Sequence, residues 1–373
     1  MNNREHWEKR VDLCKDARKQ MKNKWLTASG VRNYLRHLPE YEDISISCPK
    51  EYEIVLNTIL ELYEYSEKMF NITRNEMIEG FANCKESYLS AMAINNQSFI
   101  GAICGDIIGS VYEFHPTKDP NFKLFTPRTT FTDDTVMTCA VAEWLISDSK
   151  HSHRELIKIM HYYGNKYPHR GYGGMFGRWL EGHLTAPYNS FGNGSAMRVS
   201  PCGYYAKSLE EALQLAQISA EVTHNHPEGI KGAQAVAAII YIMKTSSINN
   251  NVNNALEEVK KFIKEHYSYK IEYTEEEWNK HSAKYSFNET CQGSVPEAIY
   301  CALSSDNYEQ AIRKAISLGG DADTQAAIAG GIASAYCPVS LEIISKCLEL
   351  LPDDLIMLIK NFNRTVITKE MTE

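Results

Sequence analysis

Helical periodicity dominates the last three quarters of this 373-residue chain. Six segments repeat apolar residues at helical spacing and are rich in good helix formers. They cover residues 136–146, 209–223, 232–244, 295–304, 308–317 and 324–335. Runs of alternating β-branched residues are nearly absent, and no strand–helix–strand rhythm is present. The pattern therefore predicts an all-α bundle.

Two stretches between these segments have little periodicity. Residues 248–254 are rich in asparagine and predict a surface loop. Residues 267–293 form a long polar segment. Because unstructured loops of that length are usually functional or disordered, we expect this segment to be one or the other.

The first quarter of the chain has a different texture, charged and poor in glycine. Leu13, Ala17 and Met21 share a helical face, and residues 54–65 have a second helical pattern. Residues 37–49 contain two prolines and predict a connector, and residues 95–97 mark a boundary. We therefore predict a helical N-terminal extension over 1–97 and a main domain over 98–373.

Charge divides along the same line. The net charge is -8, yet residues 1–40 carry ten Lys or Arg and five Asp or Glu, a balance of +5, which leaves -13 for the rest. A basic extension suits nucleic acid, an acidic protein partner or a solvated helix pair. Because acidic residues interrupt the basic ones and no nucleic-acid-binding motif follows, we expect no nucleic-acid partner.

Other features bear on the compartment. The ten cysteines include no CxxC pair, and thiols at this density fit a reducing environment. The start of the chain is too polar for a signal sequence, and the longest apolar stretch, around 233–243, is too short to span a bilayer. We therefore expect a cytoplasmic protein without membrane association.

Two acidic clusters, TDDT at 132–135 and DADT at 321–324, each precede a predicted helix. One interpretation is helix capping. However, a cap needs one acceptor, and each cluster supplies at least two carboxylates and a hydroxyl. If the helix starts converge, these oxygens suit Mg²⁺, Mn²⁺ or Ca²⁺ rather than zinc, and six of them favour two ions over one. The candidate ligands are Thr132, Asp133, Asp134, Asp321, Asp323 and Thr324.

The run GAICGDIIGSVYEF at 101–114 spaces three glycines four residues apart, which predicts close helix packing. That spacing does not explain Asp106 or Glu113 in an otherwise apolar run. Glu113 is either a paired core carboxylate or a catalytic acid or base.

Two further motifs are candidates for ligand binding. The turn GNGSAMR at 192–198 offers successive N–H groups to an anion, with Arg198 near, although an ordinary tight turn would look similar. The loop GYGGMFG at 171–177 is a weaker candidate of the same kind. His224 and His226 lack a third soft ligand nearby, so we expect no zinc, and His224 either forms structural hydrogen bonds or contacts a phosphate.

In this order the motifs GDIIGSVYEF, TDDT, GNGSAMR, THNHPEG and SLGGDADTQAAIAGGIA resemble the ADP-ribosylglycohydrolase (DraG-like) family, over about residues 98–359. The resemblance implies an orthogonal all-α bundle in which the six ligands above hold two Mg²⁺ or Mn²⁺ ions. It further implies that these ions bind the distal ribose of the substrate. It also implies that Glu113 works with the attacking water. The implied ADP-ribose-binding residues are Gly192, Asn193, Gly194, Ser195, Met197, Arg198 and His224.

The expected activity is hydrolysis of ADP-ribose from a modified protein side chain, with arginine favoured over serine. Some members of this family serve as immunity proteins against ADP-ribosyltransferase toxins, and the basic extension over 1–97 is similar in kind to those that block such toxins. The alternatives are a regulatory or housekeeping hydrolase whose extension is a lid, a binding module with a vestigial metal site, and a two-metal phosphoesterase.

Overall fold

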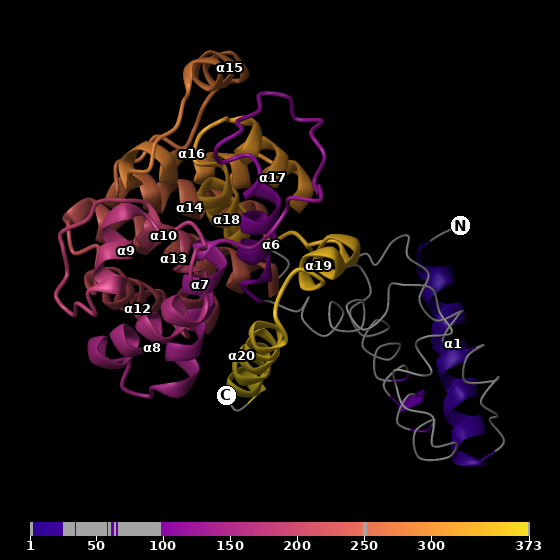
Figure 1. Ribbon diagram of the computed structural model, residues 1–373. Coiled ribbons are helices and arrows are strands. Elements are labelled where there is room, and N and C mark those ends of the chain that lie inside the picture. The colour runs from indigo at the N-terminus through magenta and orange to yellow at the C-terminus, as the bar shows by residue number, and fades with distance from the viewer. Residues whose placement is uncertain are drawn as a thin grey trace. The chain divides into compact units, whose positions relative to one another are not determined.

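A computed structural model describes residues 3–24, 34, 58, 61, 62, 65, 98–248 and 252–371. These residues form α-helices and connections, and the only extended pairing among them is an isolated antiparallel bridge between Gly192 and Thr290. The main domain is an orthogonal bundle of helices (Figure 1). The prediction of an all-α orthogonal bundle is confirmed.

The helices of the described residues have the following bounds: α1 Asn3–Lys22, α6 Ile100–Gly109, α7 Asp133–Ser147, α8 His153–Lys166, α9 Gly174–Glu181, α10 Gly194–Met197, α11 Ser200–Tyr205, α12 Leu209–Glu221, α13 Pro227–Ile248, α14 Val252–His266, α15 Glu275–Lys284, α16 Cys291–Leu303, α17 Tyr308–Ser317, α18 Ala322–Ala333, α19 Leu341–Leu348 and α20 Asp353–Met371.

The chain divides into two compact units, Met1–Met92 and Ala93–Glu373. In the first, α1 buries Cys14 and Ala17, and Arg18 donates two hydrogen bonds to Glu61, at 2.8 and 2.9 Å. On the predicted shared face, Leu13 and Met21 are partly exposed. Most of the predicted helix at 54–65, the connector at 37–49 and the boundary at 95–97 lie outside the described residues.

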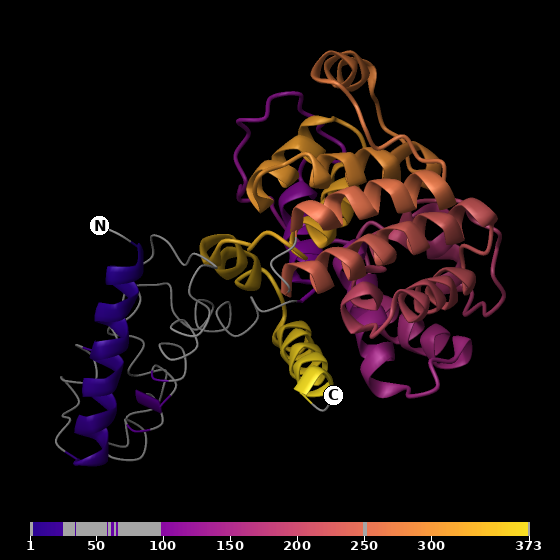
Figure 2. The ribbon, with the colours of Figure 1, turned by 180° about the vertical axis from the view of Figure 1, so that it is seen from behind.

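In the second unit, all six predicted helices are present. Two of them, α12 and α17, begin at the predicted residue, and the other four begin two to five residues earlier. At α7, Thr132 accepts a hydrogen bond from the N–H of Asp134 and caps a helix that begins at Asp133. Helix α13 packs against both α12 and α14, as the view from behind in Figure 2 shows.

The prediction for 267–293 is wrong in part, because this segment contains α15 and the start of α16. Thr274 and Glu277 form a reciprocal capping box at the start of α15. Trp278 packs on Tyr273 and Tyr300, with ring centroids 5.4 and 4.2 Å apart. The Asn-rich loop is also shorter than predicted, because α13 continues to Ile248 and α14 begins at Val252.

The glycines of α6 allow it to lie against α18. A Cβ at Gly101 would lie 2.2 Å from the Ser334 Oγ, and one at Gly105 would lie 2.1 Å from the Ala326 carbonyl. A Cβ at Gly109 would lie 2.5 Å from the Cα of Asp323. The predicted close packing is confirmed, and it brings the α6 segment alongside the second acidic cluster.

Helices α6 and α18 form the interior of the bundle. Every residue of each is buried, and Figure 1 shows both helices surrounded by others. No helix in the described part of the chain is both long and apolar enough to cross a membrane.

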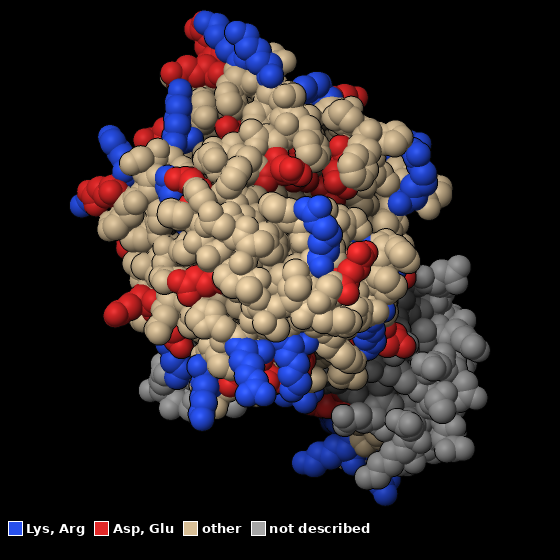
Figure 3. Space-filling model, turned by 60° about the vertical axis from the view of Figure 1, so that its left-hand side comes forward, with Lys and Arg blue, Asp and Glu red and all other residues tan. Residues whose placement is uncertain are grey.

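One face of the molecule is drawn in Figure 3. Uncharged side chains predominate in its middle, with a group of acidic side chains among them, whereas Lys and Arg lie mainly towards its margins. Several of these basic side chains lie next to one another along the lower edge of this face.

Candidate metal centre and active site

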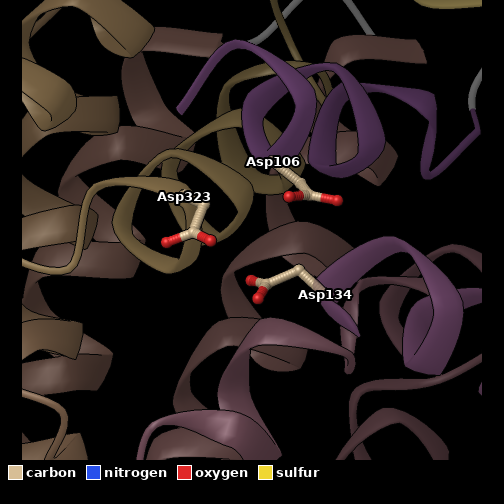
Figure 4. A group of neighbouring side chains, drawn as sticks. All are labelled: Asp106, Asp134 and Asp323. Carbon is tan, nitrogen blue, oxygen red and sulfur yellow. The ribbon is translucent and has the colours of Figure 1, made fainter. Parts of the chain in front are cut away.

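The two acidic clusters meet, although Asp134 and Thr324 are 190 positions apart in the sequence. The Thr324 hydroxyl donates to Oδ2 of Asp134 at 3.2 Å. Carboxylate oxygens of Asp106, Asp134 and Asp323 lie within 4.8 Å of one another, as do those of Glu113, Asp321 and Asp323. Figure 4 shows Asp106, Asp134 and Asp323 converging from three helices. The convergence on which the sequence argument depended is present.

Helix capping accounts for only part of the clusters. Thr132 caps α7 through its side chain, whereas Asp321, at the N-cap of α18, makes no side-chain capping hydrogen bond. Oδ1 of Asp134 is buried without a hydrogen-bond partner. A buried acceptor of this kind is costly unless something binds it. The carboxylates are therefore available for another ligand.

The electrostatics of the cluster fit a cation. Burial, together with the charges of neighbouring carboxylates, raises the pKa of Asp133, Asp134 and Asp323 well above the usual value. A divalent ion would offset this repulsion, and carboxylate and hydroxyl oxygens are the ligands that Mg²⁺ and Mn²⁺ prefer. The acidic cluster therefore contains side chains that can hold a metal ion.

Asp106 supports the first cluster from behind and was missing from the predicted site. Its Oδ1 accepts a hydrogen bond from the Thr132 hydroxyl at 2.7 Å, and its Oδ2 accepts from the Thr132 N–H at 3.0 Å and from the Thr135 N–H at 3.1 Å. The Thr135 hydroxyl donates to it as well. The signal in the sequence was a lone carboxylate in an apolar helix that the glycine spacing left unexplained.

Glu113 follows α6 and faces the second cluster. Burial, with the adjacent Asp323 carboxylate, raises the pKa of Glu113 to about 8. Of the two interpretations of this residue, the structure favours a place in the site, because Glu113 lines the same cavity as the clusters.

This cavity has a volume of about 430 Å³, within the usual range of small-molecule sites. Of the predicted site residues it is lined by Glu113, Asp133, Asp134, Gly192, Asn193, Gly194, Met197, Arg198, His224, Asp321, Asp323 and Thr324. Thr132 is not part of this lining, and its hydroxyl donates a hydrogen bond to Asp106. Ser195 is not in the lining either, because it is buried and donates to the Gly229 carbonyl at 2.7 Å.

The GNGS turn is joined to the second acidic cluster. Asn193 Nδ2 donates to Oδ2 of Asp321 at 2.7 Å, and the Asn193 N–H donates to the Glu289 carbonyl at 2.8 Å. Arg198 lies beside the cavity, but its Nη2 donates to the Ser219 carbonyl and to the Thr223 hydroxyl, at 2.7 and 2.8 Å. The guanidinium is therefore held by the protein itself.

Further lining residues come from the 171–177 loop, which was the weaker predicted candidate for ligand binding, and from segments with no such prediction. The 171–177 loop contributes Gly171, Gly173, Gly174, Met175 and Phe176, and the polar segment before α16 contributes Phe287, Glu289 and Thr290; Met137, Arg178, Tyr188, Ser190 and Phe191 complete the wall. The single aromatic residues among them carried no spacing pattern. In the sequence, only the glycine-rich loop at 171–177 and the length of the polar segment at 267–293 indicated that these parts of the chain line a site.

Buried carboxylates from two converging helix starts therefore meet at a cavity of an all-α bundle, where they could bind a metal ion. Residues 97–367 match the family model described as ADP-ribosylglycohydrolase. The chain belongs to this family and is a hydrolase of glycosidic bonds to ADP-ribose.

Curated relatives agree with this assignment. The chain is 28% identical over 304 residues to "ADP-ribosylhydrolase ARH3" of Mus musculus, a match that covers 63% of this chain and 81% of that protein. The protein of the same name from Homo sapiens is also 28% identical, with 83% of its length covered. A solved "ADP-ribosylglycohydrolase-related protein complex" has the same fold, with a TM-score of 0.55 at 20% identity, covering 76% of this chain and 99% of that one.

Proposed function

We propose that this protein is a metal-dependent hydrolase that removes ADP-ribose from a modified protein side chain. The observation that carries this proposal is the meeting of Asp134, Asp323 and Glu113 at one cavity, from segments far apart in sequence. Two Mg²⁺ ions, or Mn²⁺, would be held by Thr132, Asp133, Asp134, Asp321, Asp323 and Thr324. When bound, the ions orient the ribose hydroxyls and stabilise negative charge.

The remaining roles fall to the residues of the wall. The Glu113 carboxylate stabilises the positive charge that develops on the sugar and then accepts a proton from the attacking water. Gly192, Asn193, Gly194, Met197 and His224 bind the ADP-ribose, since they line the cavity beside the cluster. Ser195 supports this turn from behind, and Arg198 contributes its charge.

Arginine is the favoured modified residue. An ADP-ribosylated guanidinium is cationic, and Glu113 and Glu289, neither of which is assigned to the metal, supply carboxylates to the cavity. Opposite charges favour its approach to the cleft. The test is release of ADP-ribose from two peptides, one modified on arginine and one on serine. Faster release from the arginine peptide supports the proposal; exclusive release from the serine peptide contradicts the linkage, and release from neither contradicts the activity.

The N-terminal extension supports a second role, as an immunity protein that also binds an ADP-ribosyltransferase toxin. The exposed Lys15, Lys19 and Lys22 lie on α1 at spacings of four and three residues, so they share one face. The Arg18–Glu61 pair and the burial of Ala17 give that helix a folded support. A basic helix face suits an acidic protein surface such as the rim of an enzyme cleft.

Charge reversal of this face separates the two roles. The triple variant Lys15→Glu, Lys19→Glu, Lys22→Glu should hydrolyse normally but lose capture of an ADP-ribosyltransferase toxin that the wild-type protein binds. Unchanged capture would favour a regulatory hydrolase whose extension acts as a lid. We place the protein in the cytoplasm, which its eight described free cysteines support.

A further inference from the structure

A chain of hydrogen bonds ends on His224, beside the GNGS turn. Arg198 Nη2 donates to the Thr223 hydroxyl at 2.8 Å, and this hydroxyl lies 2.7 Å from Nδ1 of His224. Arg198, Thr223 and His224 are exposed by 1, 0 and 5%. Water therefore has little access to the chain, and its geometry is fixed by the protein.

The free nitrogen of His224 faces the cavity. Among the described residues no hydrogen bond reaches its Nε2, and His224 lines the cavity wall. A Cβ at Gly194 would lie 3.1 Å from Nε2 and 3.4 Å from Cε1. Because position 194 is glycine, the space in front of Nε2 is open to a ligand.

The direction of the hydrogen bonds decides what Nε2 can offer. A guanidinium only donates, so Thr223 is an acceptor towards Arg198. That leaves the single proton of the Thr223 hydroxyl for Nδ1 of His224, which lies 2.7 Å away. The ring proton then resides on Nε2.

The charge of Arg198 favours the same arrangement. A nearby cation stabilises the tautomer whose lone pair faces it and whose N–H faces away. Burial, and then the charge of Arg198, also hold the pKa of His224 well below its usual value, so the ring stays neutral. Arg198 forms no ion pair with any described carboxylate, so its charge is left for an anion in the cavity.

We propose that Arg198 and Thr223 are positioning residues that fix His224 as a neutral Nε2–H donor to an anionic oxygen of the ligand. This inference rests on the proposed function for the identity of that ligand, whose pyrophosphate supplies such oxygens. It assigns Arg198 an action through His224 rather than a direct contact.

The test is nitrogen NMR on the full-length protein labelled with ¹⁵N-histidine. The signals of His224 are identified by their loss in His224→Asn. We expect an unprotonated Nδ1 and a protonated Nε2, unchanged between about pH 6 and 8. Thr223→Val removes the hydroxyl at nearly constant shape and should give a mixture of tautomers, whereas Thr223→Ser should retain the wild-type pattern.

Calorimetry with ADP-ribose adds the functional readout. Thr223→Val should weaken binding about tenfold, the effect of one lost hydrogen bond, with KM raised and kcat little changed. Thr223→Ser should restore most of the affinity. A proton on Nδ1 in the wild-type protein, or a Thr223→Val variant with wild-type tautomer and affinity, would overturn the inference. A wild-type protein that has the expected tautomer but does not bind ADP-ribose would instead contradict the proposed function.

Discussion

Oδ2 of Asp106 accepts hydrogen bonds from the N–H groups of Thr132 and Thr135, at 3.0 and 3.1 Å. These two residues bracket Asp133 and Asp134 in the chain. A buried carboxylate on α6 therefore sets the conformation of the first acidic cluster, and the glycines of α6 bring the same helix against the second. The geometry of the site depends on this one helix.

Removal of a single donor to Asp106 should be measurable. Thr135 is fully buried, and its hydroxyl donates to the Asp106 carboxylate. Thr135→Val should lower the free energy of unfolding by about 1–3 kcal/mol, as expected for a lost hydrogen bond to a charged group. Urea denaturation measures the change.

The matched control lies on the same helix. Thr138 is also buried, but its hydroxyl makes only a 3.5 Å contact with the Met197 carbonyl. Thr138→Val should cost about 0.5 kcal/mol or less. Equal losses in the two variants would show that Asp106 does not depend on this donor.

The crowded carboxylates predict opposite effects of Asp323→Asn with and without metal. In the metal-free protein this change removes a repelling charge, so the variant should be at least as stable as the wild type. With Mg²⁺ at 100-fold above its Kd, the wild-type Tm should rise by about 5 °C and that of the variant should not. Thermal unfolding after dialysis against EDTA tests both. If neither Mg²⁺ nor Mn²⁺ changes the Tm of the wild-type protein, the result contradicts a metal centre.

Glu113→Gln separates chemistry from binding. The variant should bind ADP-ribose as the wild type does but lose turnover by about 100-fold or more, the usual contribution of a general base. Glu289→Gln, which removes a carboxylate from the same cavity, should lose less than about tenfold. If Glu113→Gln retains wild-type kcat, Glu113 has no chemical role.

Glu297, outside the cavity, predicts a pH dependence of stability. Burial raises the pKa of Glu297 to about 7 from an ordinary 4.5, while its Oε1 lies 3.1 Å from Nε2 of His281. The folded chain thus binds a proton that the unfolded chain has released, and stability falls as pH rises from about 4.5 to 7. The loss amounts to about 3 kcal/mol.

Glu297→Gln should not show this loss of stability when urea denaturation is measured from pH 5 to 8. Glu277→Gln is a control of opposite sign, because the N–H of Thr274 holds the pKa of Glu277 below its usual value. It should retain the wild-type fall towards alkaline pH. A parallel fall in Glu297→Gln and the wild type would rule out Glu297 as its source.

Much of the fold was predictable from the sequence, because the helices of the second unit carry periodic apolar faces and polar caps. Helix α15 was missed, since its burial depends on one residue, Trp278, and its capping box stood in a polar segment. The acidic clusters were predictable from their local chemistry. The role of Asp106 in supporting the first cluster was not predictable. Its partners Thr132 and Thr135 lie 26 and 29 positions further along the chain, and contacts at such separations leave no local sequence pattern.

The central claim is that the two acidic clusters form one metal-dependent catalytic centre. The most direct measurement is release of ADP-ribose from an ADP-ribosylated protein by metal-stripped enzyme, before and after addition of Mg²⁺ or Mn²⁺. We expect no release without metal, restoration on its addition, and no restoration in Asp134→Asn or Asp323→Asn, one from each cluster. Full turnover by the stripped wild-type enzyme, or by either variant, would contradict the account.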